Sequence, residues 1–594
     1  MENKELITGG EFLVKETQPE DVFIPEEFDE EQKMIGETCR DFLDTEVFPV
    51  LDRVDAQEEG LMRELLNKSG ELGLLGIAIP EEYEGFGQNF ITTMYASEVL
   101  GAGYSYAVAY SCHTGIGTLP ILYYGNEEQR QKYIPKLATG EFAGAYCLTE
   151  PGAGSDANAG STKAVLSEDG KHYILNGQKM WITNGGFADV MTVFAKIDND
   201  RVLSAFIVER DFPGITFNPE EKKMGIKGSS TRQIFFNDCK VPVENMLGKR
   251  GEGYRIALNI LHMGRIKLGA NVIGSAKKAI DQSVQYANER KQFNCLISQF
   301  GAIKHKLAEQ VIRTFATESA VYRASKAIDA AINYYVSKGD DKGRNTMEAF
   351  NHFSIEAAAM KVFGSEALDY VVDEAVQIHG GMGFSAEMPV DRGYRDSRIN
   401  RIFEGTNEIN RLLLVDAMIK KGAKKVIPLN EEAEKVFEEI KNLNGAATGE
   451  LGYYEEKALY VANFKKLIQM LLKSVSEKFT RTLVFEQEIL SNLSDCIIQL
   501  YAAESVLVRV KKMEPIKGEE GIKIYKDMLD VFVYDVAARI AKYASDVTYS
   551  FAFGETRELL EKGIAHYTKV AGVNVKEARR RIADQLIDES RYCF

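Results

Sequence analysis

One carboxylate in this sequence has neighbours that suit a general base. Glu404 stands between Phe403 and Gly405 in the string RIFEGTNEINR, which runs from Arg401 to Arg411. Apolar surroundings disfavour the charged form of a carboxyl group, so the pKa of such a glutamate rises toward the value that a base needs. An exposed or helix-capping glutamate fits the same string, and a lone glutamate is more often one of these.

Two glycine-rich strings could approach a ligand that carries phosphate. They are YCLTEPGAGSDANAG, from Tyr146 to Gly160, and QIHGGMGF, from Gln377 to Phe384. Glycine permits close backbone approach, and the N–H groups of such loops bind phosphate oxygens. The Gly152-Ala-Gly154 piece resembles part of a dinucleotide fingerprint, but no βαβ pattern follows it, so we reject that interpretation. Ordinary surface loops are the alternative for both strings.

Aromatic residues accompany these strings. Trp181, the only tryptophan, lies in a strand-like run within NGQKMWITNGG, residues 176–186; its flat ring could cover a flat cofactor, although a half-buried strand aromatic is the commoner case. Residues 224–242 are interpreted as a loop leading into an edge strand. Arg290 and Phe293 are expected to lie together on a helix or at its end, where an exposed arginine beside a core phenylalanine is the alternative.

The sequence lacks the residues for several other chemistries. It has no HExxH pair, no clustered Cys and His, no GxSxG and no GxxxxGKS/T string. Metal-dependent hydrolysis, serine hydrolysis and P-loop chemistry are therefore disfavoured, and no metal is expected. The 7 cysteines are odd in number and form no CxxC pair, which indicates reduced thiols in a cytoplasmic setting.

Charge and targeting signals narrow the class of protein further. Lys+Arg number 72 against 88 Asp+Glu, a net charge of −16, which makes nucleic acid a poor partner. The start has neither a basic n-region nor an apolar h-region, and no run of about 18 apolar residues occurs, so we expect a cytoplasmic protein without a membrane span. Basic clusters at 420–425 and 579–581 add the expectation of a weak peripheral membrane contact, which the net charge opposes.

The pattern of apolar residues predicts an α+β protein in five parts. Residues 1–24 form an N-terminal extension, 25–142 an N-terminal helical domain, 143–252 a middle antiparallel β-domain, 253–429 a C-terminal helical bundle and 430–594 an additional helical domain. Four β-rich runs, HYILNG, VMTVFAKI, LSAFIVE and RQIFFNDCKVPV, indicate the β-domain. Helical spacing dominates elsewhere. The strings KKGAKKVIPLNEEAEK and NLNGAATGELG indicate a boundary and a linker before the last unit.

In their order and spacing, these motifs resemble the acyl-CoA dehydrogenase family over roughly residues 25–420. The details ERKQFN, HMGR and SRINRIFEGTNEI, with the long C-terminal extension, are most similar to the very-long-chain branch. The resemblance implies an N-terminal helical domain, a middle β-domain and a C-terminal four-helix bundle, with FAD between the β-domain, the bundle and a neighbouring subunit. It also implies a homodimer, because the extra helices after about Ala446 would occupy the place where dimers meet in tetrameric members.

The resemblance assigns roles to individual residues. Glu404 would be the catalytic base; Gly264 stands where two other branches place theirs, which leaves Glu404 as the one candidate of the two. The implied FAD contacts are Tyr146, Leu148, Thr149, Gly154, Ser155, Trp181, Thr183, Arg290, Phe293, Gln377, Gly380, Gly381, Thr406 and Glu408. The implied substrate contacts are Ser155, His262, Arg265 and Gly405. His262 and Glu408 depart from the medium-chain pattern, which has Asp and Gln at these positions.

The implied activity belongs to fatty acid β-oxidation. Glu404 would take a proton from C2 of a fatty acyl-CoA while a hydride passes from C3 to N5 of FAD, giving trans-2-enoyl-CoA, and electron-transfer flavoprotein would receive the electrons. The very-long-chain likeness implies long-chain substrates, although the depth of the acyl cavity decides chain length. An acyl-CoA oxidase and a fold-related assembly or scaffold protein are the alternatives.

Overall fold

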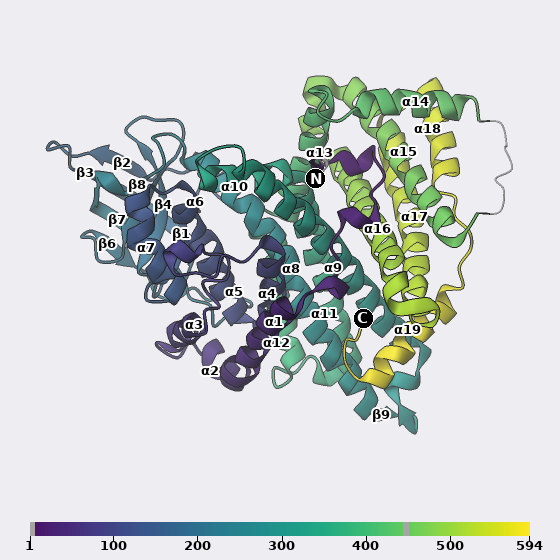
Figure 1. The fold of residues 1–594 in the computed structure, drawn as a ribbon, viewed down its shortest axis with the longest axis horizontal. Coiled ribbons are helices and arrows are strands. Elements are labelled where there is room, and N and C mark those ends of the chain that lie inside the picture. Colours follow the sequence, from purple (N-terminus) through teal and green to yellow (C-terminus); the bar gives the residue numbers. More distant parts are fainter. Residues whose placement is uncertain (1–5, 444–450) are drawn as a thin grey trace.

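The structure, a computed structural model, describes residues 6–443 and 451–594 (Figure 1). Its first domain is helical. Its helices are α1 (Glu30–Phe42), α2 (Leu51–Asp55), α3 (Leu61–Glu71), α4 (Phe90–Leu100), α5 (Ser105–Cys112), α6 (Leu119–Tyr124) and α7 (Glu127–Thr139). Side-chain caps fix where helices begin: Asp29 and Gln32 form a reciprocal capping box before α1, and Asn126 and Gln129 repeat it before α7.

The middle domain is a β-sheet. Its strands are β1 (Gly144–Cys147), β2 (Lys163–Leu166), β3 (His172–Thr183), β4 (Val190–Ile197), β5 (Ser204–Glu209), β6 (Ile215–Phe217), β7 (Thr231–Pro242) and β8 (Met246–Leu247). They lie in the order β6-β7-β3-β2-β4-β5-β8, with β1 paired to β4. Most pairs are antiparallel, whereas β4 runs parallel to β1 and β2.

The sheet contains the strands that the sequence predicted, but β7 does not lie at its edge. All four predicted β-rich runs are strands. The interpretation of residues 224–242 as leading into an edge strand was wrong, because β7 pairs with β3 on one side and with β6 on the other. The three-residue β6 covers only part of β7, and so short a strand gave no signal of its own in the sequence.

Long helices form the bundle that follows. They are α8 (Gly253–Glu289), α9 (Gly301–Val336), α10 (Lys342–His352), α11 (Ser354–His379), α12 (Pro389–Ser397) and α13 (Asn407–Ala423). Small residues let α8 and α11 approach closely: a Cβ added at Gly364 would lie 2.9 Å from a methyl group of Val272. The short strands β9 (Lys291–Gln292) and β10 (Cys295–Leu296) form a hairpin after α8.

The additional domain is also helical. It contains α14 (Leu429–Lys441), α15 (Tyr453–Phe479), α16 (Gln487–Gly521), α17 (Lys523–Phe551), α18 (Gly554–Tyr567) and α19 (Val575–Glu589). Its α16 packs against α9 and α13 of the bundle, and α19 packs against α9. In Figure 1 it lies on the far side of the bundle from the β-domain. The predicted linker falls partly on residues 444–450, outside the described residues.

The N-terminal segment lies between the bundle and the additional domain (Figure 1). The Gly10 N–H donates to Glu356 of α11 at 2.7 Å, and the Gln469 side chain of α15 donates to the Leu13 carbonyl at 2.7 Å. Phe12 and Leu13 are buried in the core that these two units share. All 7 cysteines are free thiols. Across residues 6–443 and 451–594, no helix combines the length and apolarity that crossing a bilayer requires.

Candidate active site

Glu404 lies in a short loop, residues 404–407, that leads into the start of α13. We call it the catalytic loop after the role that we propose for Glu404 below. Its backbone is held in the left-handed region, with φ +59° at Glu404 and +82° at Gly405. A non-glycine residue pays for this conformation, so it persists only where surrounding contacts determine it. Arg265 of α8 donates to the Glu404 carbonyl at 3.1 Å, and Asn410 donates to the Gly405 carbonyl at 2.8 Å.

The side chain of Glu404 has the properties of a base. Its Oε2 atom is buried and has no hydrogen-bond partner within the described part of the chain. Burial raises the pKa of this carboxyl to about 7, although the positive charges of Arg265 and Lys361 favour its ionised form. A carboxylate in this range is ionised often enough near neutral pH to accept a proton, and it is basic enough to hold one.

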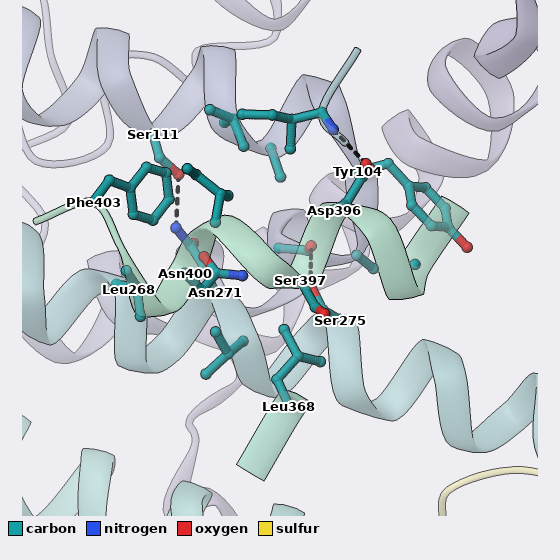
Figure 2. Close-up of a pocket in the computed structure, with 18 of the residues that line it drawn as sticks. Tyr104, Ser111, Leu268, Asn271, Ser275, Leu368, Asp396, Ser397, Asn400 and Phe403 are labelled. Carbon is teal, nitrogen blue, oxygen red and sulfur yellow. Dashed lines mark hydrogen bonds between the residues drawn. The ribbon is translucent and has the colours of Figure 1, made fainter. Parts of the chain in front are cut away.

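Glu404 lies at one end of a cavity that holds about 1200 Å³ of empty space, open mouth included. One face of α8 lines it, from Gly264 through Leu268, Asn271 and Ser275 to Gln282. The 18 residue steps from Gly264 to Gln282 span about 27 Å at about 1.5 Å each. Residues of α5, α11 and α12 complete the walls, and Figure 2 shows Asn271 bonded across to Ser111, at 2.8 Å.

Gly264 faces the carboxylate directly. A Cβ added there would lie 2.6 Å from Oε2 of Glu404. A larger residue at position 264 would therefore displace the Glu404 side chain, and glycine keeps that space for it. Side chains at positions 264 and 404 would therefore occupy the same part of the cavity.

The predicted flavin-facing residues present an open, partly aromatic surface. Trp181 is 53% exposed and has φ +60° where the β3–β7 register shifts. Thr183, two residues on, lines the cavity with Glu404. A Cβ added at Gly152 or Gly154 would meet no atom within 4 Å. An exposed flat ring beside an open glycine turn fits a flat cofactor with a phosphate group.

A buried ion pair supports that turn from behind. Lys179 of β3 donates to Glu150 at 2.6 Å, and neither side chain is more than 2% exposed. Burial would raise the pKa of Glu150, but Lys179 and the donors of Ser161 and Thr162 outweigh it and hold the pKa at about 2. The turn is thus fixed by charge-assisted hydrogen bonds. Within it, Tyr146 and Leu148 are buried, Thr149 is half-buried and Ser155 is exposed.

The remaining predicted residues fall into two places. His262 and Arg265 contact each other at 3.2 Å beside the catalytic loop, and burial, assisted by Arg265, lowers the pKa of His262 to about 3. Thr406 caps α13, with Glu408 exposed in its first turn.

A second cluster lies at the far ends of α8 and α11. It consists of Arg290, Phe293, Gln377, Gly380 and Gly381. The two helix ends are joined by stacking of Tyr286 on His379 at 4.2 Å. Arg290 is 26 residues from Gly264, about 39 Å along α8, so one chain does not bring this cluster to Glu404. Phe293 is 90% exposed, and a Cβ added at Gly380 or Gly381 would meet nothing within 4 Å.

Sequence reasoning missed two lysines near Glu404. Lys361 is fully buried and donates to Asn407 at 2.6 Å. Lys267 lines the cavity and donates to Thr114 at 3.3 Å. Lys361 could have been found, because it is the one charged residue in the run AAAMKVFGS, and a lone lysine in a buried helix is expensive unless it has a role. The cavity walls gave no such signal.

Comparison with family models and known proteins agrees with this arrangement. Models for the acyl-CoA dehydrogenase N-terminal, middle and C-terminal domains match residues 29–141, 145–239 and 251–419, and a further acyl-CoA dehydrogenase C-terminal domain model matches residues 463–564. A probable acyl-CoA dehydrogenase of Bacillus subtilis is 41% identical over 584 residues, which cover 98% of each chain. The human mitochondrial very long-chain specific acyl-CoA dehydrogenase is 38% identical over 507 residues, 79% of this chain and 73% of that one.

Solved structures show the same likeness. The crystal structure of an acyl-CoA dehydrogenase complexed with FAD from Bacillus anthracis matches with a TM-score of 0.95 at 42% identity, covering 99% of this chain and all of that one. Butyryl-CoA dehydrogenase from Megasphaera elsdenii matches with a TM-score of 0.60 at 35% identity, covering 66% of this chain and 98% of that one. The shorter relative therefore corresponds to two thirds of this chain.

Proposed function

The chain belongs to the acyl-CoA dehydrogenase family, and on that premise we propose that it binds FAD and oxidises long-chain acyl-CoA to trans-2-enoyl-CoA, with Glu404 as the base. The observation that carries this proposal is the unpartnered, buried Oε2 of Glu404 at the end of a long cavity. A carboxylate placed there can remove a proton from C2 of a thioester whose acyl chain fills the cavity.

Several residues support the binding of FAD. The turn from Tyr146 to Ser155 would hold it together with Trp181 and Thr183, and the cluster at Arg290 and Phe293 would meet the FAD of a second subunit. When bound, FAD supplies the acceptor for the hydrogen that leaves C3 with its electron pair. The protein's own contribution is to hold C2 against Glu404 and to exclude water from the cavity.

The backbone of the catalytic loop suits the thioester oxygen. The Glu404 N–H donates to no atom of residues 6–443 or 451–594, so it is free to stabilise negative charge that develops there. Arg265 fixes the loop through the Glu404 carbonyl and, with His262, provides polar groups near the cavity for the CoA portion. Glu404 would in this way supply both a backbone N–H and a carboxylate to the substrate.

The cavity supports a long acyl chain. An extended chain advances about 1.2 Å per bond, since one residue of extended backbone covers about 3.3–3.6 Å in three bonds. The 27 Å face of α8 therefore accommodates about 22 bonds. The high likeness to a protein named as very long-chain specific points the same way.

Further parts of the proposal concern partners and place in the cell. Electron-transfer flavoprotein would accept the electrons. A homodimer would complete the FAD site, since Phe293 of the second cluster is 90% exposed and Phe384, which follows the glycines of that cluster, is 91% exposed. We keep the cytoplasm as the proposed location, with at most a weak peripheral membrane contact.

The test combines cofactor analysis with substrate titration. Acid-denatured protein should release about one FAD per chain, and straight-chain acyl-CoAs of graded length should bleach the flavin absorbance under anaerobic conditions. Long chains should bleach it fastest. Protein that is colourless and cannot be reconstituted with FAD would overturn the proposal, whereas preference for the shortest chains would overturn only the chain length.

A further inference from the structure

A continuous series of polar contacts connects the catalytic loop to the additional helical domain. Asn407, the first residue of α13, accepts from the Lys361 ammonium of α11 at 2.6 Å and donates to Glu366 at 3.0 Å. Arg411, one turn further along α13, contacts both oxygens of Glu366 at 2.8 and 2.9 Å. The same arginine donates to Asp495 of α16 at 2.8 Å.

Most members of this series of contacts are largely removed from water, whereas the Glu366 side chain is 41% exposed. Lys361 is fully buried, and it forms no ion pair with a carboxylate of the described residues. The side chains of Arg411 and Asp495 are 15% and 19% exposed. Removing the Asp495 charge would leave the half-buried Arg411 guanidinium with Glu366 as its remaining carboxylate partner, so the arginine would be held less firmly.

This series of contacts ends beside Glu404. Charged and titratable groups face the Glu404 carboxylate from four elements: Arg265 of α8, Lys361 of α11, Cys112 of α5 and Tyr146 of β1. Of these, Lys361 is the one whose position depends on Asn407, which is itself part of the catalytic loop. The loop is therefore held directly by contacts with α8 and α11. It is held indirectly by α16, which contacts α13.

We propose that the additional helical domain positions the catalytic loop, with Asp495 as a positioning residue that acts through Arg411 and Asn407. This inference rests on the proposed role of Glu404 as the base. Loss of the Asp495 contact lets the first turn of α13 shift, which displaces Glu404 from C2. A misplacement of about 1 Å can cost about 100-fold in rate. Affinity for the acyl chain depends mainly on α8 and α5 and should change little.

A matched control exists at the same domain boundary. Arg579 of α19 donates to Glu309 of α9 at 2.8 Å and to Asp535 of α17 at 2.8 Å. This arrangement also joins one arginine to a bundle carboxylate and to a carboxylate of the additional domain. It has no contact with the catalytic loop, so Asp535→Asn tests the general effect of weakening the boundary.

The experiment compares kcat and KM of FAD-loaded, full-length Asp495→Asn and Asp535→Asn with one long-chain acyl-CoA. Asp495→Asn should lower kcat about tenfold or more while KM stays within about twofold, and Asp535→Asn should change neither. Asp495→Glu, which keeps the charge, should recover part of kcat. If the Asp495→Asn variant loses FAD, the Arg411→Lys variant is measured in its place, because lysine keeps the charge but loses the bidentate contact. The same fall in kcat at nearly constant KM is expected.

Two outcomes would overturn the inference: equal kcat values for the Asp495 and Asp535 variants, or a fall in Asp495→Asn that appears only in KM. Glu404→Gln is measured in parallel. Turnover retained by Glu404→Gln would refute the proposed function itself. An inactive Glu404→Gln variant together with an unaffected Asp495→Asn variant would refute only the positioning role.

Discussion

Replacing Glu404 by glutamine should remove most of the turnover and all of its pH dependence near neutrality. Glutamine keeps the size of the side chain and can occupy the same space against Gly264, but it cannot accept the C2 proton. Loss of a positioned base costs about 10²–10⁴-fold in rate. Acyl-CoA binding should survive, because the walls of the cavity and the backbone of the catalytic loop are unchanged.

The pH dependence of the native enzyme follows from the pKa of Glu404, which burial raises to about 7. The base works only when ionised, so activity is lost as the pH falls through this value. The ionised fraction is about one tenth at pH 6 and about nine tenths at pH 8, which predicts a rise in kcat/KM of about tenfold between them. Burial lowers the pKa of Lys361 to about 7 as well, so the measured value belongs to the pair.

The assay is anaerobic stopped-flow mixing with a long-chain acyl-CoA, following the loss of flavin absorbance at pH 6, 7 and 8. The native protein should show the tenfold rise, and Glu404→Gln should be slow and flat. Lys361→Met separates the two titrations: it removes a positive charge that favours ionised Glu404, so the rise should move to higher pH. A Glu404→Gln variant that reduces flavin at near the native rate, or that keeps the native pH slope, would refute the assignment of the base.

Three further outcomes are expected. Gly264→Glu should restore part of the activity of Glu404→Ala but less of that of Glu404→Gln, because a Cβ at 264 would lie 2.6 Å from the end of the residue-404 side chain; equal rescue would contradict the shared space. Lys179→Met should lower the free energy of unfolding by about 3–5 kcal/mol by leaving Glu150 buried and unpaired; denaturant titration checks this, and an unchanged midpoint would contradict it. Light scattering should show two chains per particle, and four would contradict the dimer.

Local patterns predicted much of this fold. The run VMTVFAKI is a strand because β-branched and aromatic residues suit a sheet. Both of its faces are buried because Val190 and Phe194 pack into the large core shared with the helices, whereas Met191 and Val193 pack into the core of the β-domain. Glu404 was predicted from its string and from the resemblance of the surrounding motifs. The edge-strand interpretation of β7 failed because β6, its partner on the second side, is a three-residue strand that left no signal of its own in the sequence.

The environment of Glu404 could not be predicted in the same way. Its pKa depends on Arg265 and Lys361, which are 139 and 43 positions away and meet it only through the packing of α8 and α11. Asp495 is 84 residues beyond Arg411, and nothing in the string SNLSDCIIQL distinguishes its aspartate from one on a solvated face. The depth of the cavity likewise comes from facing helices, which periodicity identifies as buried without showing the space between them.

The N-terminal segment has a consequence for how this molecule reaches its native state. Gly10 and Leu13 find their partners 346 and 456 residues later in the chain. Because synthesis proceeds toward the C-terminus, Gly10 and Leu13 are made long before their partners, and closing so long a loop is slow. The catalytic domains can assemble earlier around their own local contacts. Completion of the boundary between the bundle and the additional domain must therefore wait until α15 has been made, which places its formation late in folding.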